Sequence, residues 1–130
     1  MPGHYHAVVW IDQSRARVFH FSLDEADGTT IRPDHSVHDV SHGERRTGHR
    51  VPIDREFLEK VAAAIADAGA ILIVGPAQEK DELAKYLAEK HPSIRARVEA
   101  VESADHPTDG ELLDHARRFA EAADRMRPQT

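Results

Sequence analysis

The chain has 130 residues and 40% hydrophobic side chains, so we expect a single domain spanning residues 1–130 with one core. A formal net charge of -6 argues against a surface that binds nucleic acid non-specifically over its whole area. The absence of cysteine excludes disulfides and thiolate metal sites, and no apolar run approaches the roughly 20 residues that span a bilayer. The N-terminus lacks the features of a signal peptide, so we expect a cytoplasmic protein without a membrane partner.

The N-terminal part of the sequence predicts three strands. Residues 6–11 and 16–21 are rich in β-branched and aromatic side chains and flank the polar turn 12–15, which is typical of a hairpin. The acidic stretch 23–28 is interpreted as a turn, and residues 29–32 as a short third strand that ends at a proline. Together these segments predict an antiparallel meander.

A helix is predicted after residue 53. Asp54 can cap it, because an aspartate at this position accepts a hydrogen bond from the first-turn backbone. Apolar side chains recur at helical spacing, and Gly69 stands where a left-handed terminating residue is expected. The apolar positions are Phe57, Val61, Ile65 and Ala68.

The strand predicted over residues 70–74 organises the fold. Ile71, Leu72, Ile73 and Val74 follow one another without a polar interruption, so both faces of this strand are expected to be buried in the centre of a sheet. Burial of each of these side chains contributes roughly 1.5–3 kcal/mol. The following Gly-Pro pair at 75–76 is interpreted as a tight exit from the strand.

The C-terminal part predicts a helix over residues 78–90, an edge strand over 97–101 and a last helix. The first helix has Leu83, Ala84 and Leu87 on its inner face, and the strand alternates apolar and charged residues. Thr108 and Glu111 form a capping box at the start of the last helix. The expected inner stripe of that helix is Leu112, Ala116, Phe119, Ala123 and Met126. The order βββαβαβα predicts an α/β protein with a mixed five-stranded sheet and helices on both faces.

Two stretches carry a resemblance to a known family. Residues 7–19 (Ala7-Val8-Val9-Trp10-Ile11-Asp12 to Phe19) resemble the first hairpin of the middle domain of archaeal and eukaryotic class-I peptide-chain release factors and of Pelota. Residues 71–76 resemble the central strand of that domain, and 80–82 the start of its next helix. Residues 4–12 and 105–110 are also similar to small bacterial single-domain relatives labelled "translational machinery protein". The resemblance implies a ribonuclease-H-like fold and a role in translation.

The sequence departs from that family in the long segment 33–50. Release factors carry a Gly-Gly-Gln tripeptide there, which enters the peptidyl-transferase centre and helps to hydrolyse peptidyl-tRNA. Here the segment has no Gly-Gly pair, and the chain has no glutamine between Gln13 and Gln78. The termination activity is therefore not expected, and we predict a non-catalytic protein that requires no cofactor.

Residues 33–50 form the candidate binding segment, because they show no periodicity and exceed the roughly 12–15 residues usual for a loop inside a domain. Arg45, Arg46, His49 and Arg50 are spaced closely enough to contact successive phosphates, and Gly43 allows close backbone approach. With the resemblance, this predicts binding to the ribosome or to tRNA. The alternative interpretation is a solvated segment whose charges bind nothing.

Two other functions stay open at this point. His35, His38, His42 and Asp39 have the spacing of metal ligands, which would suit a metal-dependent phosphoester hydrolase. A homo-oligomer that pairs through the edge strand 97–101 or through the first hairpin is the other alternative.

Three further carboxylates and the tryptophan are assigned structural roles. Asp12, Asp105 and Asp109 could be proposed as the carboxylates of a ribonuclease H site, but Asp12 falls in a turn and Asp109 in the first turn of a helix. We therefore interpret Asp12 as a turn former. Trp10 is expected in the core rather than in a base-stacking surface.

Overall fold

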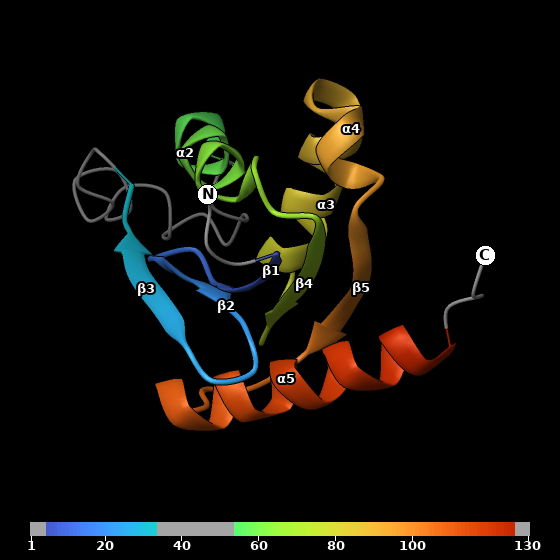
Figure 1. Ribbon diagram of the computed structural model, residues 1–130. Helices are drawn as coiled ribbons and strands as arrows, with labels where there is room; N and C mark the ends of the chain where they lie inside the picture. The colour runs from blue at the N-terminus through green and yellow to red at the C-terminus, as the bar shows by residue number, and fades with distance from the viewer. Residues whose placement is uncertain (1–4, 34–53, 127–130) are drawn as a thin grey trace.

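Five strands form one mixed sheet in the order β3-β2-β1-β4-β5 (Figure 1). The computed structural model describes residues 5–33 and 54–126. β1 (His6–Ile11), β2 (Ala16–Phe21) and β3 (Ala26–Ile31) are joined antiparallel, whereas β4 (Ala70–Gly75) runs parallel to both β1 and β5 (Val98–Ser103). The predicted mixed five-stranded α/β sheet is confirmed.

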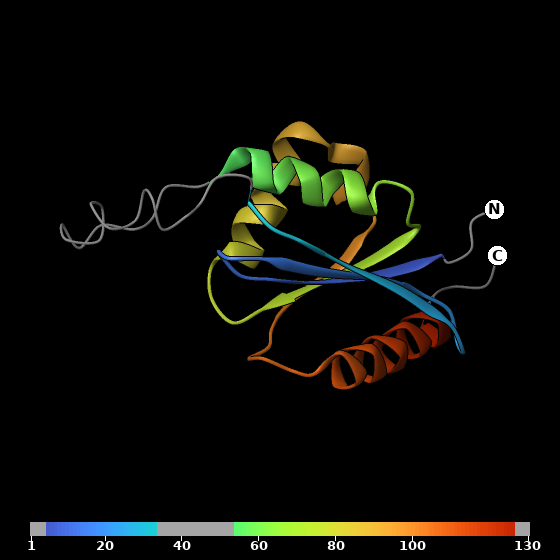
Figure 2. The same cartoon turned by 90° about the vertical axis from the view of Figure 1, so that its left-hand side faces the viewer.

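Helices cover both faces of this sheet. α2 (Arg55–Ile65), α3 (Glu79–Lys90) and the short α4 (Pro92–Arg95) lie on one side, and α5 (Asp109–Met126) lies on the other (Figure 2). None of the described helices is long and apolar enough to cross a membrane. The two layers of side chains that result are separate: Ile71 and Ile73 pack under α2 and α3, while Leu72 and Val74 pack against α5.

β4 is buried along its whole length, as the unbroken aliphatic run predicts. It lies between β1 and β5, so neither edge of β4 faces solvent. The middle position of the sheet belongs to β1, where only His6 is partly exposed. Trp10 lies within β1 and is completely buried, which confirms its place in the core.

Gly75 is the last residue of β4, and a side chain at this position would collide with the neighbouring strand. A Cβ atom on this residue would lie 2.3 Å from the carbonyl oxygen of Ile11 in the neighbouring strand. The Gly-Pro pair therefore allows two strand ends to approach closely, and this agrees with its interpretation as a tight exit.

Helix α2 begins where the sequence predicts but ends earlier. Asp54 Oδ1 accepts a hydrogen bond from the Phe57 backbone N at 3.0 Å, so the predicted cap is confirmed. The helix ends at Ile65 with Ala66 as its right-handed C-cap. The prediction of a left-handed Gly69 is wrong, because its φ lies outside the left-handed range. Gly69 is instead a site of close contact, at which a Cβ would lie 2.1 Å from the Tyr5 ring.

Two other boundaries differ from the prediction. β3 begins at Ala26 within the stretch interpreted as a turn, because every residue of it pairs with β2. After α3, Pro92 begins the short helix α4, which the sequence analysis does not predict.

The inner face of α5 also differs in part from the prediction. Leu112, Ala116 and Ala120 are its buried residues, while Phe119 and Ala123 are only partly buried. The predicted capping box is confirmed, since the Glu111 N donates to Thr108 Oγ1 at 3.1 Å and the Thr108 N donates to Glu111 Oε1 at 2.9 Å.

Candidate functional site

The candidate site lies at the end of the sheet where β1 and β4 finish. β3 ends at Ile31 beside the start of β2, and Arg32 and Pro33 then lead into the segment 34–53, which returns to the fold at Asp54. We call this region the carboxyl end of the sheet. Open α/β sheets commonly bind ligands at this end.

The residues singled out from the sequence lie beyond the described part of the chain. The structure therefore shows where the segment that carries them is attached, and their roles stay predictions. For nucleic-acid binding these are Gly43, Arg45, Arg46, His49 and Arg50, and for metal binding His35, His38, Asp39 and His42.

The turn between β1 and β2 is held by Asp12. Its Oδ1 accepts hydrogen bonds from the backbone N of Ser14 at 2.8 Å and of Arg15 at 3.0 Å. This pattern is an Asx-type turn, in which an aspartate side chain accepts hydrogen bonds from backbone N–H groups that are not paired between the strands. The interpretation of Asp12 as a turn former is confirmed.

Trp10 connects this end of the sheet to the segment that precedes α5. Its indole Nε1 donates to the carbonyl oxygen of Asp105 at 2.7 Å, and the His106 ring lies 5.1 Å from it between centroids. Two guanidinium groups lie over the indole, with Cζ of Arg17 at 4.7 Å and Cζ of Arg15 at 5.4 Å from the ring centroid. Cation–π contacts of this kind contribute about 0.5–2 kcal/mol.

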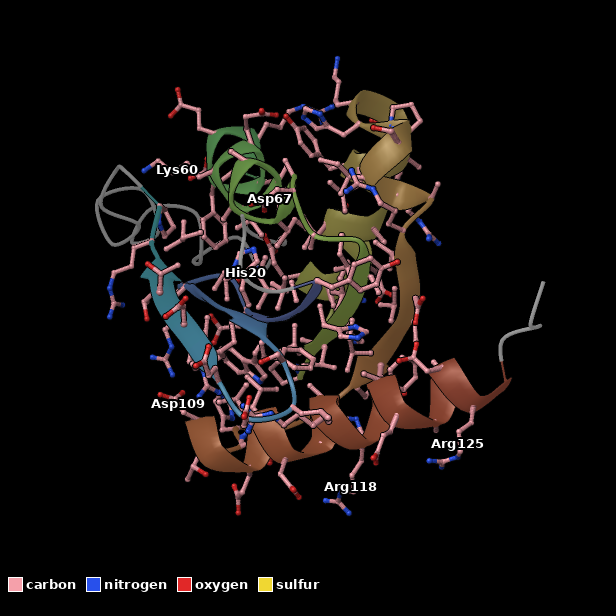
Figure 3. The ribbon with its side chains drawn as sticks, viewed as in Figure 1. His20, Lys60, Asp67, Asp109, Arg118 and Arg125 are labelled. Carbon is pink, nitrogen blue, oxygen red and sulfur yellow. The ribbon has the colours of Figure 1, made fainter. Side chains whose placement is uncertain are left out.

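Arg17 fixes the same segment by two further hydrogen bonds. Its Nη1 donates to Asp109 Oδ1 at 2.8 Å and its Nη2 to the Pro107 carbonyl oxygen at 2.8 Å. Asp109 is the first residue of α5, and Figure 3 shows it at the beginning of that helix. Of the three carboxylates considered for a ribonuclease H site, Asp109 thus pairs with Arg17, and Asp12 forms its turn. The described residues contain no group of three or more potential metal ligands.

The carboxyl end also contains a buried acid. Glu79, the first residue of α3, is 8% exposed, and it is the one polar or charged residue that the described part of the chain buries. Burial is the largest cause of the rise in the pKa of its carboxyl from 4.5 to about 7. The carboxylates of Glu82, Asp12 and Asp54 add to this rise, in that order.

A second polar cluster joins α2 to the end of α3. Tyr86 Oη donates to Glu59 Oε1 at 2.5 Å, and His91 Nε2 lies 2.8 Å from the same oxygen. The bond to His91, followed by the bond to Tyr86, lowers the pKa of the Glu59 carboxyl, and the bond to Glu59 raises the pKa of Tyr86. A surface pocket of about 130 Å³ lies beside this cluster; it is lined by Arg55, Leu58, Glu82, Lys85, Tyr86 and Glu89.

Sequence reasoning missed two residues of this region, Arg17 and Glu79. The strand pattern places Arg17 opposite Trp10 once the hairpin register is known, so that contact could have been found from the predicted hairpin. Nothing local distinguishes Glu79 from Asp81 or Glu82, which share the first turn of α3. Two of the carboxylates that raise its pKa, Asp12 and Asp54, are distant in sequence.

Comparison with known proteins gives a match of fold. No family model matches the chain, and no curated protein matches its sequence. Among solved structures, Pelota of Archaeoglobus fulgidus superposes over 93% of this chain with a TM-score of 0.62 and 15% identity. The archaeal translation termination factor aRF1 superposes over 92% with a TM-score of 0.56 and 11% identity.

The chain has the fold of a domain found in Pelota and aRF1. Dom34 of S. cerevisiae, described as a translation termination-like factor, agrees with this over 94% of the chain at a TM-score of 0.55 and 10% identity. The chain spans 36–39% of the length of these three structures. The expected likeness to the release factor and Pelota domain is thus confirmed at the level of fold. The ribonuclease-H-like label stays a prediction with which the strand order is consistent.

Proposed function

We propose that the protein is a non-catalytic, translation-associated protein that binds the ribosome or tRNA through residues 33–50. The observation that carries this proposal is the fold, which nearly the whole chain shares with aRF1 and Dom34. The first is described as a translation termination factor, and the second as a termination-like factor in RNA quality control pathways that interacts with Hbs1. A cytoplasmic location follows from this role.

The charge pattern of the segment supports contact with phosphates. Arg45, Arg46, His49 and Arg50 occur within six positions, and Gly43 leaves room for the backbone to approach an RNA strand. At the described base of the segment, Arg32 is exposed and Arg15 lies over Trp10. These two cations could extend a phosphate-binding surface from the segment onto the domain.

Peptidyl-tRNA hydrolysis is not part of the proposal. The segment lacks a Gly-Gly pair, and no glutamine stands between Gln13 and Gln78. A protein with this fold that binds without hydrolysis would occupy or mark a ribosomal site, and its role would be that of an accessory factor.

Co-sedimentation with ribosomes and binding to bulk tRNA at low and moderate salt test this proposal. The triple variant R45A/R46A/R50A is expected to lose at least tenfold in affinity, because each arginine removed takes away a phosphate contact. The matched control K90A/R118A/R125A removes three exposed cations elsewhere, and Figure 3 shows Arg118 and Arg125 on α5. Equal affinities of the two variants would contradict the assignment to residues 33–50.

Two other functions are separated by simple measurements. A phosphoester hydrolase that uses His35, His38, Asp39 and His42 requires bound metal, so elemental analysis of the purified protein distinguishes it from the accessory role. A homo-oligomer would form through β5, which is an edge strand of the sheet. The first hairpin does not offer an edge, since β3 and β4 cover its two sides, so that part of the prediction is wrong.

A further inference from the structure

β3 is an edge strand with a regular backbone. It lies at one side of the sheet, and within the described part of the chain no strand lies beyond it (Figure 1). All six residues of β3 pair with β2 in an unbroken register, and residues 27–30 are exposed. An edge strand without proline, lysine or a bulge is a template for pairing with another strand. The sheet can therefore be extended at β3.

β5, the other edge strand, is less suited to pairing. Its register with β4 shifts between Ile71 and Leu72, so the ladder at this edge is irregular. It also carries Glu99 and Glu102, and Glu102 Oε1 lies 2.9 Å from His115 Nε2. Irregular register and charged side chains are features that protect a sheet edge. The two edges of the sheet thus differ, and β3 is the less protected one.

The hydrogen bonds between β2 and β3 determine which backbone groups of β3 point away from the sheet. Ser22 N donates to Glu25 O at 2.9 Å, so these two residues form a hydrogen-bonded pair. Hydrogen-bonded and non-hydrogen-bonded pairs alternate along an antiparallel ladder. In the register of β2 with β3, every second residue from Asp27 to Ile31 therefore faces β2. The outward N–H and C=O groups are those of Ala26, Gly28 and Thr30.

Two β3 strands can pair antiparallel with Gly28 at the centre. Such a pair must place outward backbone groups opposite one another, and this register places Ala26 opposite Thr30 of the second copy. Asp27 then lies opposite Thr29 of the second copy, so a carboxylate faces a hydroxyl. Directly opposite residues have Cβ atoms about 4.5–5.5 Å apart. The register therefore brings a hydrogen-bonding pair together on each side of the centre.

The charges at the two ends of β3 are complementary in this register. Arg32 of one copy lies opposite the turn residues Asp24 and Glu25 of the second copy, and the reverse pair forms at the other end. These three side chains are exposed and form no hydrogen bond or ion pair within the described residues. Arg117 fixes the turn, since its Nε donates to Ser22 O at 2.8 Å and its Nη2 to Glu25 O at 2.9 Å. Both ion pairs can therefore form without breaking an existing contact.

Phe19 adds an apolar contact at the centre of this pairing. Its ring lies over Gly28, where an added Cβ would be 2.3 Å from ring atom Cε1. Phe19 is only partly buried. Neighbouring strands lie about 4.8 Å apart, so the two Phe19 rings, each placed over a glycine, would approach each other across the central pair. Pairing would thus cover apolar surface that one copy leaves exposed.

We propose that the protein forms a symmetric dimer in which the β3 strands of two copies pair antiparallel about Gly28 and join their sheets. The dimer is independent of the proposed function. Interfaces that bury less than about 1,200 Å² belong to weak and transient complexes. A single ladder of this length is a small interface, so we expect a dissociation constant of about 10–1,000 µM.

Sedimentation equilibrium of the full chain, from about 10 µM to about 1 mM, tests the association. Salt of about 0.15 M screens the repulsion between two chains that each carry a net charge of -6. The average mass should rise from 14.5 kDa toward twice that value. A mass that stays at 14.5 kDa at every concentration, or one that passes twice this value, would overturn the proposal of a closed pair.

Amide hydrogen exchange of the wild-type protein locates the interface without any variant. The outward amides of Gly28 and Thr30 should exchange rapidly in dilute solution and at least twofold more slowly at about 1 mM. The amides of Asp27 and Thr29 face β2 and should be protected at both concentrations. A dimer that leaves Gly28 and Thr30 unchanged would reject β3 as the interface. Protection of these two amides in the monomer would reject it as well, because the chain itself would then cover the edge.

Exchange of charges tests the register. Arg32→Glu replaces both ion pairs by like charges, so it is expected to weaken association at least tenfold. The triple variant R32E/D24K/E25K restores opposite charges and should recover most of the affinity. Arg118→Glu on α5 is the control and should keep the wild-type dissociation constant. Circular dichroism checks that each variant is folded.

The outcomes leave the dimer and its register separately testable. Wild-type association of Arg32→Glu, or a triple variant as weak as Arg32→Glu, would overturn the register centred on Gly28. None of these measurements contains RNA, so loss of ribosome or tRNA binding would reject the proposed function and leave the dimer to be decided by mass and amide exchange.

Discussion

Arg17 lies over the buried ring of Trp10, with its Cζ 4.7 Å from the ring centroid, while its Nη1 donates to Asp109 at 2.8 Å. One side chain of β2 thereby links the middle strand of the sheet to the first residue of α5. The contact spans 92 positions between Arg17 and Asp109, so it depends on the completed fold.

Replacing Arg17 should destabilise the domain markedly. Arg17→Ala removes two hydrogen bonds and a cation–π contact over a buried ring, and we expect it to lower the free energy of unfolding by about 1.5–3 kcal/mol. Arg118→Ala is the control, because the Arg118–Asp114 pair is exposed and such pairs contribute about 0–1 kcal/mol. Urea denaturation measures both. A loss no larger for Arg17→Ala than for Arg118→Ala would contradict the role given to this side chain.

Two glycines should respond to alanine in opposite directions. Gly75→Ala places a Cβ 2.3 Å from the Ile11 carbonyl oxygen, so we expect a loss of at least about 2 kcal/mol as the strand ends separate. A Cβ on Gly110, in the first turn of α5, would meet nothing within 4 Å. Gly110→Ala should therefore stabilise the fold by up to about 1 kcal/mol through helix propensity. Thermal unfolding of the two variants checks the pair, and the same sign for both would contradict the packing described.

Stability should fall as the pH rises from about 4.5 to 7, because of Glu79. The folded pKa of about 7 lies above the ordinary value of 4.5, so the folded state binds this proton more tightly than the unfolded chain. The contribution is complete below the unfolded pKa, decreases between the two values and is lost above the folded pKa. It amounts to at most about 3 kcal/mol. Urea midpoints from pH 5 to pH 8 should decline in the wild type and decline less in Glu79→Gln; parallel curves would refute this source.

Because of Glu59, stability should fall as the pH is lowered through the acid range. Its folded pKa is lowered, first by the hydrogen bond to His91 and then by that to Tyr86, so its contribution is present above the unfolded pKa and lost as the pH falls through the folded pKa. Glu59→Gln should therefore flatten the acid side of the stability curve below about pH 4.5. Tyr86→Phe removes one of the two hydrogen bonds and should produce part of that change. An acid limb unchanged by Glu59→Gln would show that the cluster does not hold in solution.

The sequence predicts the fold best where the residues of a single helix or strand determine its structure. The aliphatic run of β4 must be buried, because exposing it to water would be unfavourable. The caps at Asp54 and Thr108 are hydrogen-bonding patterns between residues close in the sequence. The start of β3 differs from the prediction, because Asp27 and Gly28 disfavour a strand on their own. Pairing with β2 overrides that preference, and the Phe19 ring packs where a Cβ on Gly28 would lie.

The candidate site was predictable only in outline. The resemblance to the release factor and Pelota domain predicted the fold. The break in periodicity after Pro33 indicated where a long segment follows β3. The hydrogen bonds from Arg17 to Asp109 and Pro107 join residues that are far apart in the sequence, as do the effects of Asp12 and Asp54 on Glu79. Neighbouring residues in the sequence therefore carry no sign of these interactions. The assignments within residues 34–53 stay predictions that binding experiments decide.

The salt dependence of tRNA binding tests the central claim most directly. For binding through Arg45, Arg46 and Arg50, a plot of log affinity against log salt for the triple alanine variant should be shallower than the wild-type plot by about 2–3 units, since each phosphate contact contributes a slope of about 0.7–0.9. The control K90A/R118A/R125A should keep the wild-type slope. A triple variant with the wild-type slope and affinity would contradict the claim that residues 33–50 bind RNA.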